Sequence, residues 1–549
     1  MTIEPRLGAL AFGAVVTAYV FGYLLWYSGT PLGHVPLLDE REILALATRI
    51  AAGNLPPESF YRAPLYSALL AVPLWLGVNP LALPLLARLF NGVCHLLSVW
   101  VVWRLAGVLW RRRAAQIFSA TLVGFNPVLL HFCGDALDIT TAITALVAGV
   151  AAALIAIRRA QRPGWWWSIA SLAFGLGALL RPQLMPLLVA LPVIGLMIGH
   201  PPHALRQIFA ATVPGVLCLV IFGAINYALA DEFRILPWQG AYNLWAANRP
   251  GAHGRYFEQR IPIHTNDPGA NTARIESEIL YRRQQPGASR SPQAMSDYWR
   301  DQALRVIAAN PLAWLRLLTS KAFYLVNNVE QYNNKTFSFH QSRSPWLRHN
   351  PLNWTMVLSA GVVGLVLHWR RPESRLLTLL AAAYAAGVLL YFVSDRFRAP
   401  LIPLFAIGAG GVISLPATGR RWPALAAGAA LAGLSLVPIP RAEQQRTYVQ
   451  DELALARAHS ELGEHAQALG WALRALERAP NRTSVLALAC VTRFNAWLHA
   501  PSAIMPSDLA QWRGDCRAAA ELSPTARRIL GYLAWRAGAL AESRALWVA

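Results

Sequence analysis

Asp39 and Glu40 form an acidic pair that follows the first apolar run of the chain, Leu7 to Trp26, by about a dozen residues. A carboxylate at the edge of an apolar segment can take the proton from an attacking hydroxyl or amine and so act as a general base. The alternative is a structural role, because an aspartate just before a helical run is an ordinary N-cap. Glu40 and Glu42 fit that alternative better than Asp39 does.

Asp135 and Asp138 lie in a very short turn between two apolar segments. The turn keeps both carboxylates at the membrane surface, where each can bind a cation, orient an arginine or be solvated. Charge at the end of a span is only mildly costly, so a structural and a functional role are equally well supported. A divalent cation could bind at Asp39 with Asp135 or Asp138, although the sequence contains no metal-binding motif.

Three arginines stand at junctions between apolar segments: Arg181, Arg396 and Arg398. A guanidinium group at the lipid surface suits bidentate contact with a phosphate. Alternatively these side chains pair with Asp395 or other carboxylates as structural clamps. Arg396 and Arg398 flank Phe397 and cannot both face one direction on a helix, so we expect at least one of them to point elsewhere.

The composition places these residues in a membrane protein. Of 549 residues, 55% are hydrophobic and only 14% are charged, which excludes a disordered chain and disfavours an ordinary soluble enzyme. The formal net charge is +21, but the arginines form short clusters between apolar segments rather than a basic face. This pattern argues against nucleic-acid binding and is typical of cytoplasmic membrane loops.

The arginine clusters set the expected topology. They are Arg111 to Arg113, Arg158 with Arg159 and Arg162, Arg206, Arg370 with Arg371, and Arg420 with Arg421. If all are cytoplasmic, the segments around Asp39, Asp135, Asp231 and Arg396 lie on the opposite, periplasmic side.

About eleven spans fit this topology. They are residues 7–27, 81–105, 115–133, 139–157, 167–180, 183–199, 207–229, 352–369, 376–393, 399–416 and 422–438. Two further apolar stretches, 65–78 and 311–326, would place an arginine cluster outside if they were counted as spans. We therefore expect them to be helices in the outer interface.

A polar insertion at residues 231–310 contains Trp238, Tyr242, Trp245 and Tyr256 and predicts a small external domain or lid. Interfacial anchoring is the preferred role for these aromatic residues and sugar stacking the second.

Residues 441–549 have lower hydropathy and resemble a degenerate tetratricopeptide array, a class that binds peptides or partner proteins; the alternative is an ordinary helical bundle. The topology places this tail in the periplasm, where Cys490 and Cys516 either pair or remain as two inert thiols.

Residues 1–440 resemble the GT-C membrane glycosyltransferases, in particular family 39 and the lipid A aminoarabinose transferase-like group. The likeness rests on the order and membrane sidedness of four passages. These are Asp39-Glu40 with the helix after it, Tyr61-Arg62-Ala63-Pro64-Leu65-Tyr66, Leu180-Arg181-Pro182, and Arg396-Phe397-Arg398-Ala399-Pro400-Leu401-Ile402-Pro403.

The resemblance implies an all-α polytopic enzyme of the bacterial inner membrane. Such an enzyme moves a sugar from a polyprenyl-phosphate donor to a protein, glycan or lipid acceptor at the periplasmic face. The acidic pair Asp39 and Glu40 matches the catalytic acidic position of the family, with Asp39 as general base. Glu42 and Ile43 stand where related sequences often have an aromatic residue, which leaves the donor sugar open.

The same resemblance suggests which basic groups bind the donor phosphate. Arg181 with Arg396 or Arg398 are the first choice, and Arg62 and Lys321 the second. Two other functions remain open. One is a transporter or flippase of lipid-linked sugars, which would line a path across the bilayer with polar residues. The other is an inactive scaffold that recruits partner proteins through its tail.

Overall fold

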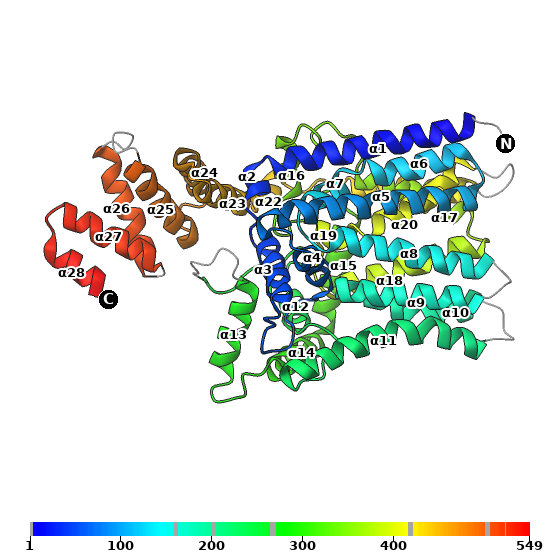
Figure 1. The fold of residues 1–549 in the computed structure, drawn as a ribbon, viewed down its shortest axis with the longest axis horizontal. Helices are drawn as coiled ribbons and strands as arrows, with labels where there is room; N and C mark the ends of the chain where they lie inside the picture. The colour runs from blue at the N-terminus through cyan, green and yellow to red at the C-terminus, as the bar shows by residue number, and fades with distance from the viewer. Residues whose placement is uncertain are drawn as a thin grey trace.

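The computed structural model describes residues 4–158, 163–198, 204–263, 271–414, 421–499, 506–521 and 523–548. Within these ranges the regular secondary structure is helical, apart from an isolated β-bridge between Asn333 and Lys335. Figure 1 shows a bundle of long helices and a smaller group of helices that projects from one end of it. The predicted all-α fold class is confirmed.

Apolar helices build the bundle. They are α1 (Glu4–Ser28), α5 (Leu83–Trp110), α6 (Arg113–Gly124), α7 (Pro127–Gly134), α8 (Ile139–Arg158), α9 (Pro163–Leu180), α10 (Met185–Ile198), α11 (Ala204–Ala230), α17 (Trp354–Leu367), α18 (Pro372–Leu390), α20 (Leu401–Ile413) and α21 (Arg421–Ser435). Every span expected from the sequence falls on these helices. Among the described residues, five helices are long and apolar enough to cross a membrane, and the pair α6 and α7 adds a sixth if it forms one span.

The expected span 115–133 is not one straight helix. It divides into α6 and α7, which are bent by 45° relative to each other. Pro127 lacks the backbone N–H that would continue α6, and the Asn126 side chain accepts hydrogen bonds from the N–H groups of Val128 and Leu129. This cap starts a new helix that ends at Gly134, immediately before Asp135.

The arginine clusters lie together at one end of the bundle. Arg158 forms an ion pair with Glu373 (2.6 Å), Arg371 donates to the carbonyl of Leu109, and Arg112 donates to the carbonyl of Ile413. The described start of the chain is at this end, whereas the tail is at the other (Figure 1). Arg159, Arg162 and Arg420 lie outside the described residues.

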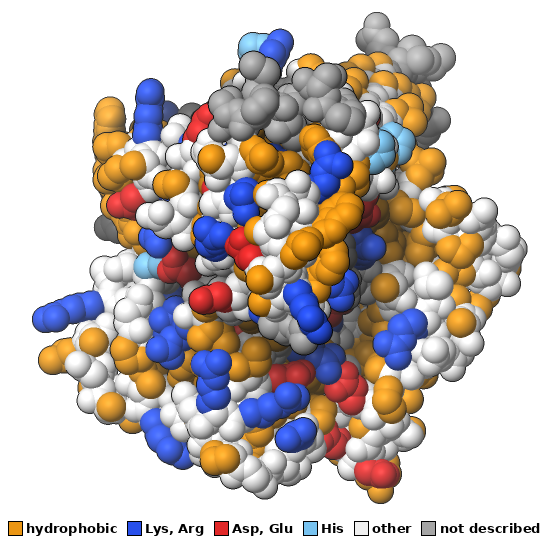
Figure 2. Space-filling view, turned by 90° about the vertical axis from the view of Figure 1, so that its left-hand side faces the viewer, with side chains coloured by type: hydrophobic (Ala, Val, Ile, Leu, Met, Phe, Trp, Pro, Cys, Tyr) orange, Lys and Arg blue, Asp and Glu red, His pale blue; other side chains and the backbone are white. Residues whose placement is uncertain are grey.

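Short helices cover the opposite end of the bundle. They are α2 (Pro31–His34), α3 (Asp39–Ala51), α4 (Leu65–Trp75), α15 (Pro311–Val326), α16 (Phe337–Arg343) and α19 (Asp395–Arg398), with one-turn helices η1 (Pro80–Ala82) and η2 (Pro182–Leu184). The short helices α4 and α15 coincide with the two stretches that were not expected to be spans. Figure 2 views the molecule from this side, with the tail toward the viewer, and basic side chains on this face are interspersed with acidic and apolar ones.

The helices of the insertion are α12 (Gln239–Asn248), α13 (Thr272–Gln284) and α14 (Pro292–Ala309). They enclose an aromatic core to which Tyr61, from outside the insertion, also belongs. Trp238 and Tyr242 are each 1% exposed, and the Tyr242 and Trp245 rings pack on Trp299. The expectation that these residues anchor the membrane or stack on sugar is therefore wrong for Trp238, Tyr242 and Trp245. Their apolar surface stabilises the insertion itself. Of these four aromatic residues, Tyr256 is the one that lines the cavity described below.

The tail contains α22 (Arg441–Gln445), α23 (Tyr448–Glu461), α24 (His465–Arg478), α25 (Thr483–His499), α26 (Pro506–Ala520), α27 (Pro524–Arg536) and α28 (Leu540–Val548). The helix pairs α23 with α24 and α27 with α28 are each joined by a turn, at Gly463 and at Gly538, with φ of +77° in both, a conformation that favours glycine. Cys490 and Cys516 form a disulfide between α25 and α26, so the alternative of two free thiols is wrong. The tetratricopeptide assignment itself remains a prediction.

The first tail helix is docked on the body. Ala454 and Ala458 of α23 belong to the same hydrophobic core as the bundle. The fully buried Asp451 accepts a hydrogen bond from the backbone N–H of Thr336 (2.9 Å), and its Oδ1 also lies 2.9 Å from Nε2 of His340. This joint fixes the tail against the segment that follows α15.

Replacing Asp451 with alanine is expected to loosen this joint, because it leaves the Thr336 N–H buried without a partner at a cost of about 1–3 kcal/mol. We expect faster amide hydrogen exchange in α16 and α23 and unchanged exchange in α8. Glu477→Ala, an exposed residue of α24, is the matched control and should leave exchange in α16 and α23 unchanged. Equal exchange in Asp451→Ala and wild type would show that the docking does not depend on this carboxylate.

Candidate active site

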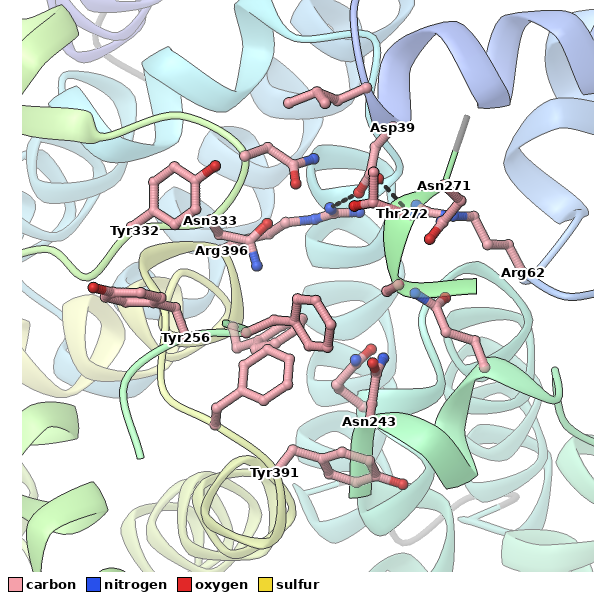
Figure 3. Close-up of a pocket in the computed structure, with 18 of the residues that line it drawn as sticks. Asp39, Arg62, Asn243, Tyr256, Asn271, Thr272, Tyr332, Asn333, Tyr391 and Arg396 are labelled. Atoms are coloured by element: carbon pink, nitrogen blue, oxygen red, sulfur yellow. Dashed lines mark hydrogen bonds and ion pairs between the residues drawn. The ribbon is translucent and has the colours of Figure 1, made fainter. Parts of the chain in front are cut away.

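The helix that carries Asp39 begins at a strained residue. Leu38 precedes α3 with φ of +53°, a conformation that costs a non-glycine residue about 1–3 kcal/mol and is typical of functional sites. No side chain caps this helix end. The N-cap role considered for Asp39 is therefore wrong: Asp39 is the first residue of α3, and its carboxylate faces a cavity instead (Figure 3).

Two arginines from distant parts of the chain bind the Asp39 carboxylate. Arg62 donates to Oδ1, and Nη1 of Arg396 lies 2.6 Å from Oδ2. Arg62 also contacts Glu42, with Nε 2.8 Å from Oε2. Burial raises the pKa of Asp39, but the two guanidinium groups outweigh that effect and hold the pKa well below its usual range. Asp39 is thus a stabilised carboxylate, and a weak base for as long as both arginines remain.

Arg396 connects Asp39 to a second carboxylate. Its Nη2 lies 2.9 Å from Oδ1 of Asp138, which also binds Nη1 of Arg181 at 2.8 Å. Burial raises the pKa of Asp138, but Arg181 and Arg396 lower it overall. The α7–α8 turn, the end of α9 and α19 therefore place Asp138, Arg181 and Arg396 around one point. The predicted meeting of Asp39 with Arg181 and Arg396 in one cavity is found in the structure.

Glu40 and Asp135 face away from this cavity into a buried cluster. Lys335 lies between them, with Nζ 2.6 Å from Oε1 of Glu40, 2.5 Å from Oδ1 of Asp135 and 2.8 Å from the hydroxyl of Tyr27. Burial raises the pKa of Glu40, against the lowering effect of Lys335. Sequence reasoning missed Lys335, although lysine is rare in this arginine-rich chain and the only other one is Lys321. The cluster fixes the start of α3 and so positions Asp39.

Replacing Lys335 with methionine is expected to destabilise the protein by about 3–5 kcal/mol, because Glu40 and Asp135 would be left as a buried, uncompensated pair of carboxylates. The measurement is thermal unfolding of the purified protein in detergent. A triple variant that also carries Glu40→Gln and Asp135→Asn should regain a large part of the lost stability. An unchanged Tm in Lys335→Met would contradict this role of the ammonium group.

Arg398 and Lys321 do not line the cavity. Arg398 turns away to Glu330, with Nη2 2.5 Å from Oε1, so the expectation that Arg396 and Arg398 point in different directions is confirmed. Nζ of Lys321 donates to the side-chain oxygen of Asn248 at 2.9 Å, and burial lowers its pKa to about 7. In this structure neither side chain can contact a molecule bound at Asp39.

The cavity has a volume of about 1840 Å³ and is bounded by the bundle, the insertion and the tail. On one side it continues as an apolar groove between α10 and α18. The lining side chains are Met185, Val189, Val193 and Met197 on α10, and Leu379, Ala383, Gly387 and Leu390 on α18. Positions three or four apart share one face of a helix, so each helix presents one continuous apolar stripe. The groove suits a long, flexible apolar chain.

Uncharged polar side chains line other parts of the same cavity (Figure 3). They are Asn243, Tyr256, Asn271, Thr272, Tyr332, Asn333 and Tyr391. Amide and hydroxyl groups of this kind can bind sugar hydroxyls by hydrogen bonds in either direction. Sequence reasoning missed all of them except Tyr256, because they come from five separate segments that no local pattern connects.

The described residues contain no cluster of three or more His, Cys, Asp or Glu side chains that could hold a metal ion. Each carboxylate at the Asp39 end of the cavity is already paired with a cationic side chain: Asp39 and Glu42 with Arg62, and Asp138 with Arg181 and Arg396. A divalent cation at Asp39 and Asp138 would have to replace Arg396, the side chain that bridges them.

Residues 63–227 match the family model described as dolichyl-phosphate-mannose-protein mannosyltransferase. This match supports the resemblance to GT-C glycosyltransferases within that segment and includes Asp138 and Arg181. Comparison with curated protein sequences gives no significant match.

Three similar solved structures come from two organisms. The apo oligosaccharyltransferase of Archaeoglobus fulgidus is 13% identical, with a TM-score of 0.42 over 80% of this chain and 58% of that one. The oligosaccharyltransferase AglB of the same archaeon, in complex with an inhibitory peptide and a dolichol-phosphate, is 13% identical (TM-score 0.39, 82% and 58% covered). ArnT of Cupriavidus metallidurans bound to undecaprenyl phosphate is 18% identical (TM-score 0.32, 73% and 77% covered). The chain spans only 58% of the length of the two archaeal structures.

Proposed function

We propose that this integral membrane protein is a glycosyltransferase that moves a sugar from a polyprenyl-phosphate donor to an acceptor. The observation that carries the proposal is the joining, in one cavity, of a carboxylate and three guanidinium groups with an apolar groove. The matching family model supports it, because its description names a lipid-phosphate sugar as donor. A site for such a donor must bind an anion, a sugar and a long apolar chain together, and this cavity offers a region for each.

The donor phosphate binds Arg181 and Arg396 in this proposal, and its lipid chain lies in the groove between α10 and α18. Both arginines border the groove and the Asp39 region of the cavity. They are at present paired with Asp138 and Asp39, so the phosphate competes for them. Each hydrogen bond that Arg396 transfers from Asp39 to the phosphate makes the carboxylate a stronger base. Donor binding thereby raises the basicity of Asp39, which acts as the general base.

Asp39 then takes the proton from the acceptor hydroxyl or amine as this group attacks the anomeric carbon. One bond forms between the nucleophile and the anomeric carbon, and the bond from that carbon to the phosphate oxygen breaks. The electron pair leaves with the lipid phosphate, whose added negative charge Arg181 and Arg396 stabilise. The reaction is a single displacement with inversion at the anomeric carbon.

We place the Asp39 end of the bundle, the insertion 231–310 and the tail in the periplasm of a bacterium. The arginine clusters at the opposite end support a cytoplasmic location for that end. The disulfide Cys490–Cys516 supports an oxidising compartment for the tail. We further propose that residues 1–440 form the transferase domain and residues 441–549 a domain of their own that is docked on it.

Transport of a lipid-linked sugar has less support than transfer. Arg88 and His95 are buried polar residues of α5, but Nε of Arg88 donates to the carbonyl of Gly134 (2.8 Å) and His95 contacts the carbonyl of Gly124. Neither residue lines the cavity. They satisfy backbone groups at helix ends.

The experiment that tests the proposal is transfer of radiolabel from synthetic polyprenyl-phosphate sugars in proteoliposomes that contain the purified protein and an envelope extract. We expect label in an acceptor fraction and release of polyprenyl phosphate in equal amounts. Movement of intact donor across the bilayer without release of polyprenyl phosphate would overturn the proposal in favour of transport. If neither sugar transfer nor donor movement is detected, the remaining hypothesis is an inactive scaffold that recruits partner proteins.

A further inference from the structure

The positive charge of the cavity is unevenly distributed. At the donor end, Arg62, Arg181 and Arg396 face an equal number of carboxylates, Asp39, Glu42 and Asp138, and are neutralised by them. At the end formed by the insertion and the tail, four basic residues line the cavity: Arg260, Arg446, Arg457 and Arg482. The acidic lining residues at this end are only two, Glu258 and Glu461. Arg446 pairs with Glu258 (2.8 Å), and Glu461 pairs with Arg41, which lies outside the cavity lining (2.9 Å). The excess of cationic groups therefore lies on the side away from the donor groove.

Arg457 and Arg482 are the notable members of this set. Arg457 lies on α23, and Arg482 directly precedes α25, so both project from the tail into the cavity. Both side chains are partly buried, and within the described part of the chain neither has a carboxylate within 4 Å. When the side-chain amide of Gln450 is oriented so that both its oxygen and its nitrogen are hydrogen-bonded, the oxygen accepts from both terminal nitrogens of Arg482 (2.5 and 2.8 Å). Glu461 attracts Arg457 and Glu258 attracts Arg482 only from beyond ion-pair distance. A partly buried guanidinium group without a direct ion pair gains from binding an anion.

The position of the two arginines fits an acceptor better than a donor. In a displacement with inversion, the nucleophile approaches the anomeric carbon from the face opposite the leaving phosphate. The donor phosphate lies at Arg181 and Arg396, beside the groove, so the acceptor must extend from Asp39 away from the groove. The wall on that side is the tail face that carries Gln450, Arg457, Arg482 and Ser484. Asp451 holds this face against the body, so the wall is fixed.

We propose that the acceptor carries an anionic group, a phosphate or a carboxylate, that binds Arg457 and Arg482 while its nucleophile reaches Asp39. This inference rests on the proposed transferase function and assigns the tail a direct part in substrate selection. The tail is then a wall of the active site in addition to any partner protein it binds.

The test compares a double variant, Arg457→Gln with Arg482→Gln, with wild type in two assays. The first is transfer of label from polyprenyl-phosphate sugar to an envelope extract, and the second is slow hydrolysis of the same donor with no acceptor present. Loss of two charged hydrogen-bond partners should lower transfer at limiting extract by about 10–100-fold. Hydrolysis should remain within about twofold, because the donor arginines are intact. Arg474→Gln, on α24 and outside the cavity lining, is the matched control and should leave both rates unchanged.

Inorganic pyrophosphate and citrate serve as probes of the anion itself. Each should inhibit transfer to the extract competitively in wild type, and the stronger inhibitor indicates whether the acceptor group is a phosphate or a carboxylate. The inhibition constant should rise about tenfold or more in the Gln double variant. The double variant Arg457→Lys with Arg482→Lys retains the charges and should recover part of the transfer.

Two results would overturn the inference while leaving the transferase intact: unchanged transfer in the Gln double variant, or an equal fall of transfer and hydrolysis. Failure of the proposed function looks different, because wild type would then show neither transfer nor donor hydrolysis.

Discussion

Replacing Asp39 with asparagine is expected to lower kcat for sugar transfer by about 10²–10⁴-fold, the usual contribution of a positioned general base. Asparagine keeps the shape of the side chain but cannot accept the proton of the nucleophile. Its carbonyl oxygen still accepts from one arginine, so the cavity should remain assembled and the donor should bind about as tightly as before. The measurement is initial-rate transfer from a labelled polyprenyl-phosphate sugar, together with the apparent KM for the donor.

The matched control is Glu42→Gln. Glu42 lies on the same helix, lines the same cavity and binds the same Arg62, but it does not contact Arg396. We expect a loss of less than about tenfold, because only an ion pair that is partly exposed is removed. If the two variants lose equal activity, Asp39 acts through the electrostatics of the site and is not the base.

Replacing Arg396 with glutamine should lower kcat by about 10²–10³-fold, the usual loss when one preorganised donor to a developing anion is removed. Arg396 has the larger effect among the cavity arginines because it touches Asp39 and Asp138 at once and would be the group that moves to the phosphate. Arg370→Gln, at the opposite end of the bundle, is the control and should leave kcat unchanged. A variant that lowers only donor affinity, with kcat preserved, would reduce Arg396 to a binding residue.

The same variant should change the pH dependence of kcat/KM. The base must be deprotonated, so activity falls as the pH drops through the pKa of Asp39 in the free enzyme. Arg62 and Arg396 hold that pKa well below its usual range in spite of burial, so the acidic limb of the wild type lies at very low pH. Loss of the Arg396 charge raises the pKa of Asp39, so the acidic limb of the kcat/KM profile should shift to higher pH in the variant. A limb that stays in place would mean that another group sets it.

Several features of the fold follow from the sequence because a local property determines them. The apolar runs predict the bundle helices, since a helix that crosses a bilayer must be apolar over nearly its whole length. The arginine clusters predict which helix ends meet, and the contacts of Arg158 and Arg371 confirm it. The bend between α6 and α7 also has a local signal, the pair Asn126-Pro127, but the long apolar segments on both sides of this pair conceal it.

The site was only partly predictable, and for a physical reason. Asp39, Arg181 and Arg396 could be grouped because each is a charge at an apolar junction on the same side of the membrane. Lys335 and Arg482 lie in polar segments, so their sequence context does not distinguish them from other surface residues. Only tertiary packing brings Lys335 to Glu40 and Arg482 to the cavity. The aromatic residues of the insertion were misjudged because their spacing does not distinguish a small helical core from an interfacial belt.

The cavity is assembled from both ends of the chain, and this has a consequence for biogenesis. Asp39 is synthesised near the beginning, whereas Arg457, Arg482 and Ser523, which line the same cavity, are synthesised near the end. A ribosome-bound chain that has inserted all its membrane helices still lacks one wall of the chamber. On the proposed function, transfer to an acceptor therefore waits for the tail segments that carry Arg457, Arg482 and Ser523, whereas binding of the donor at Arg181 and Arg396 does not.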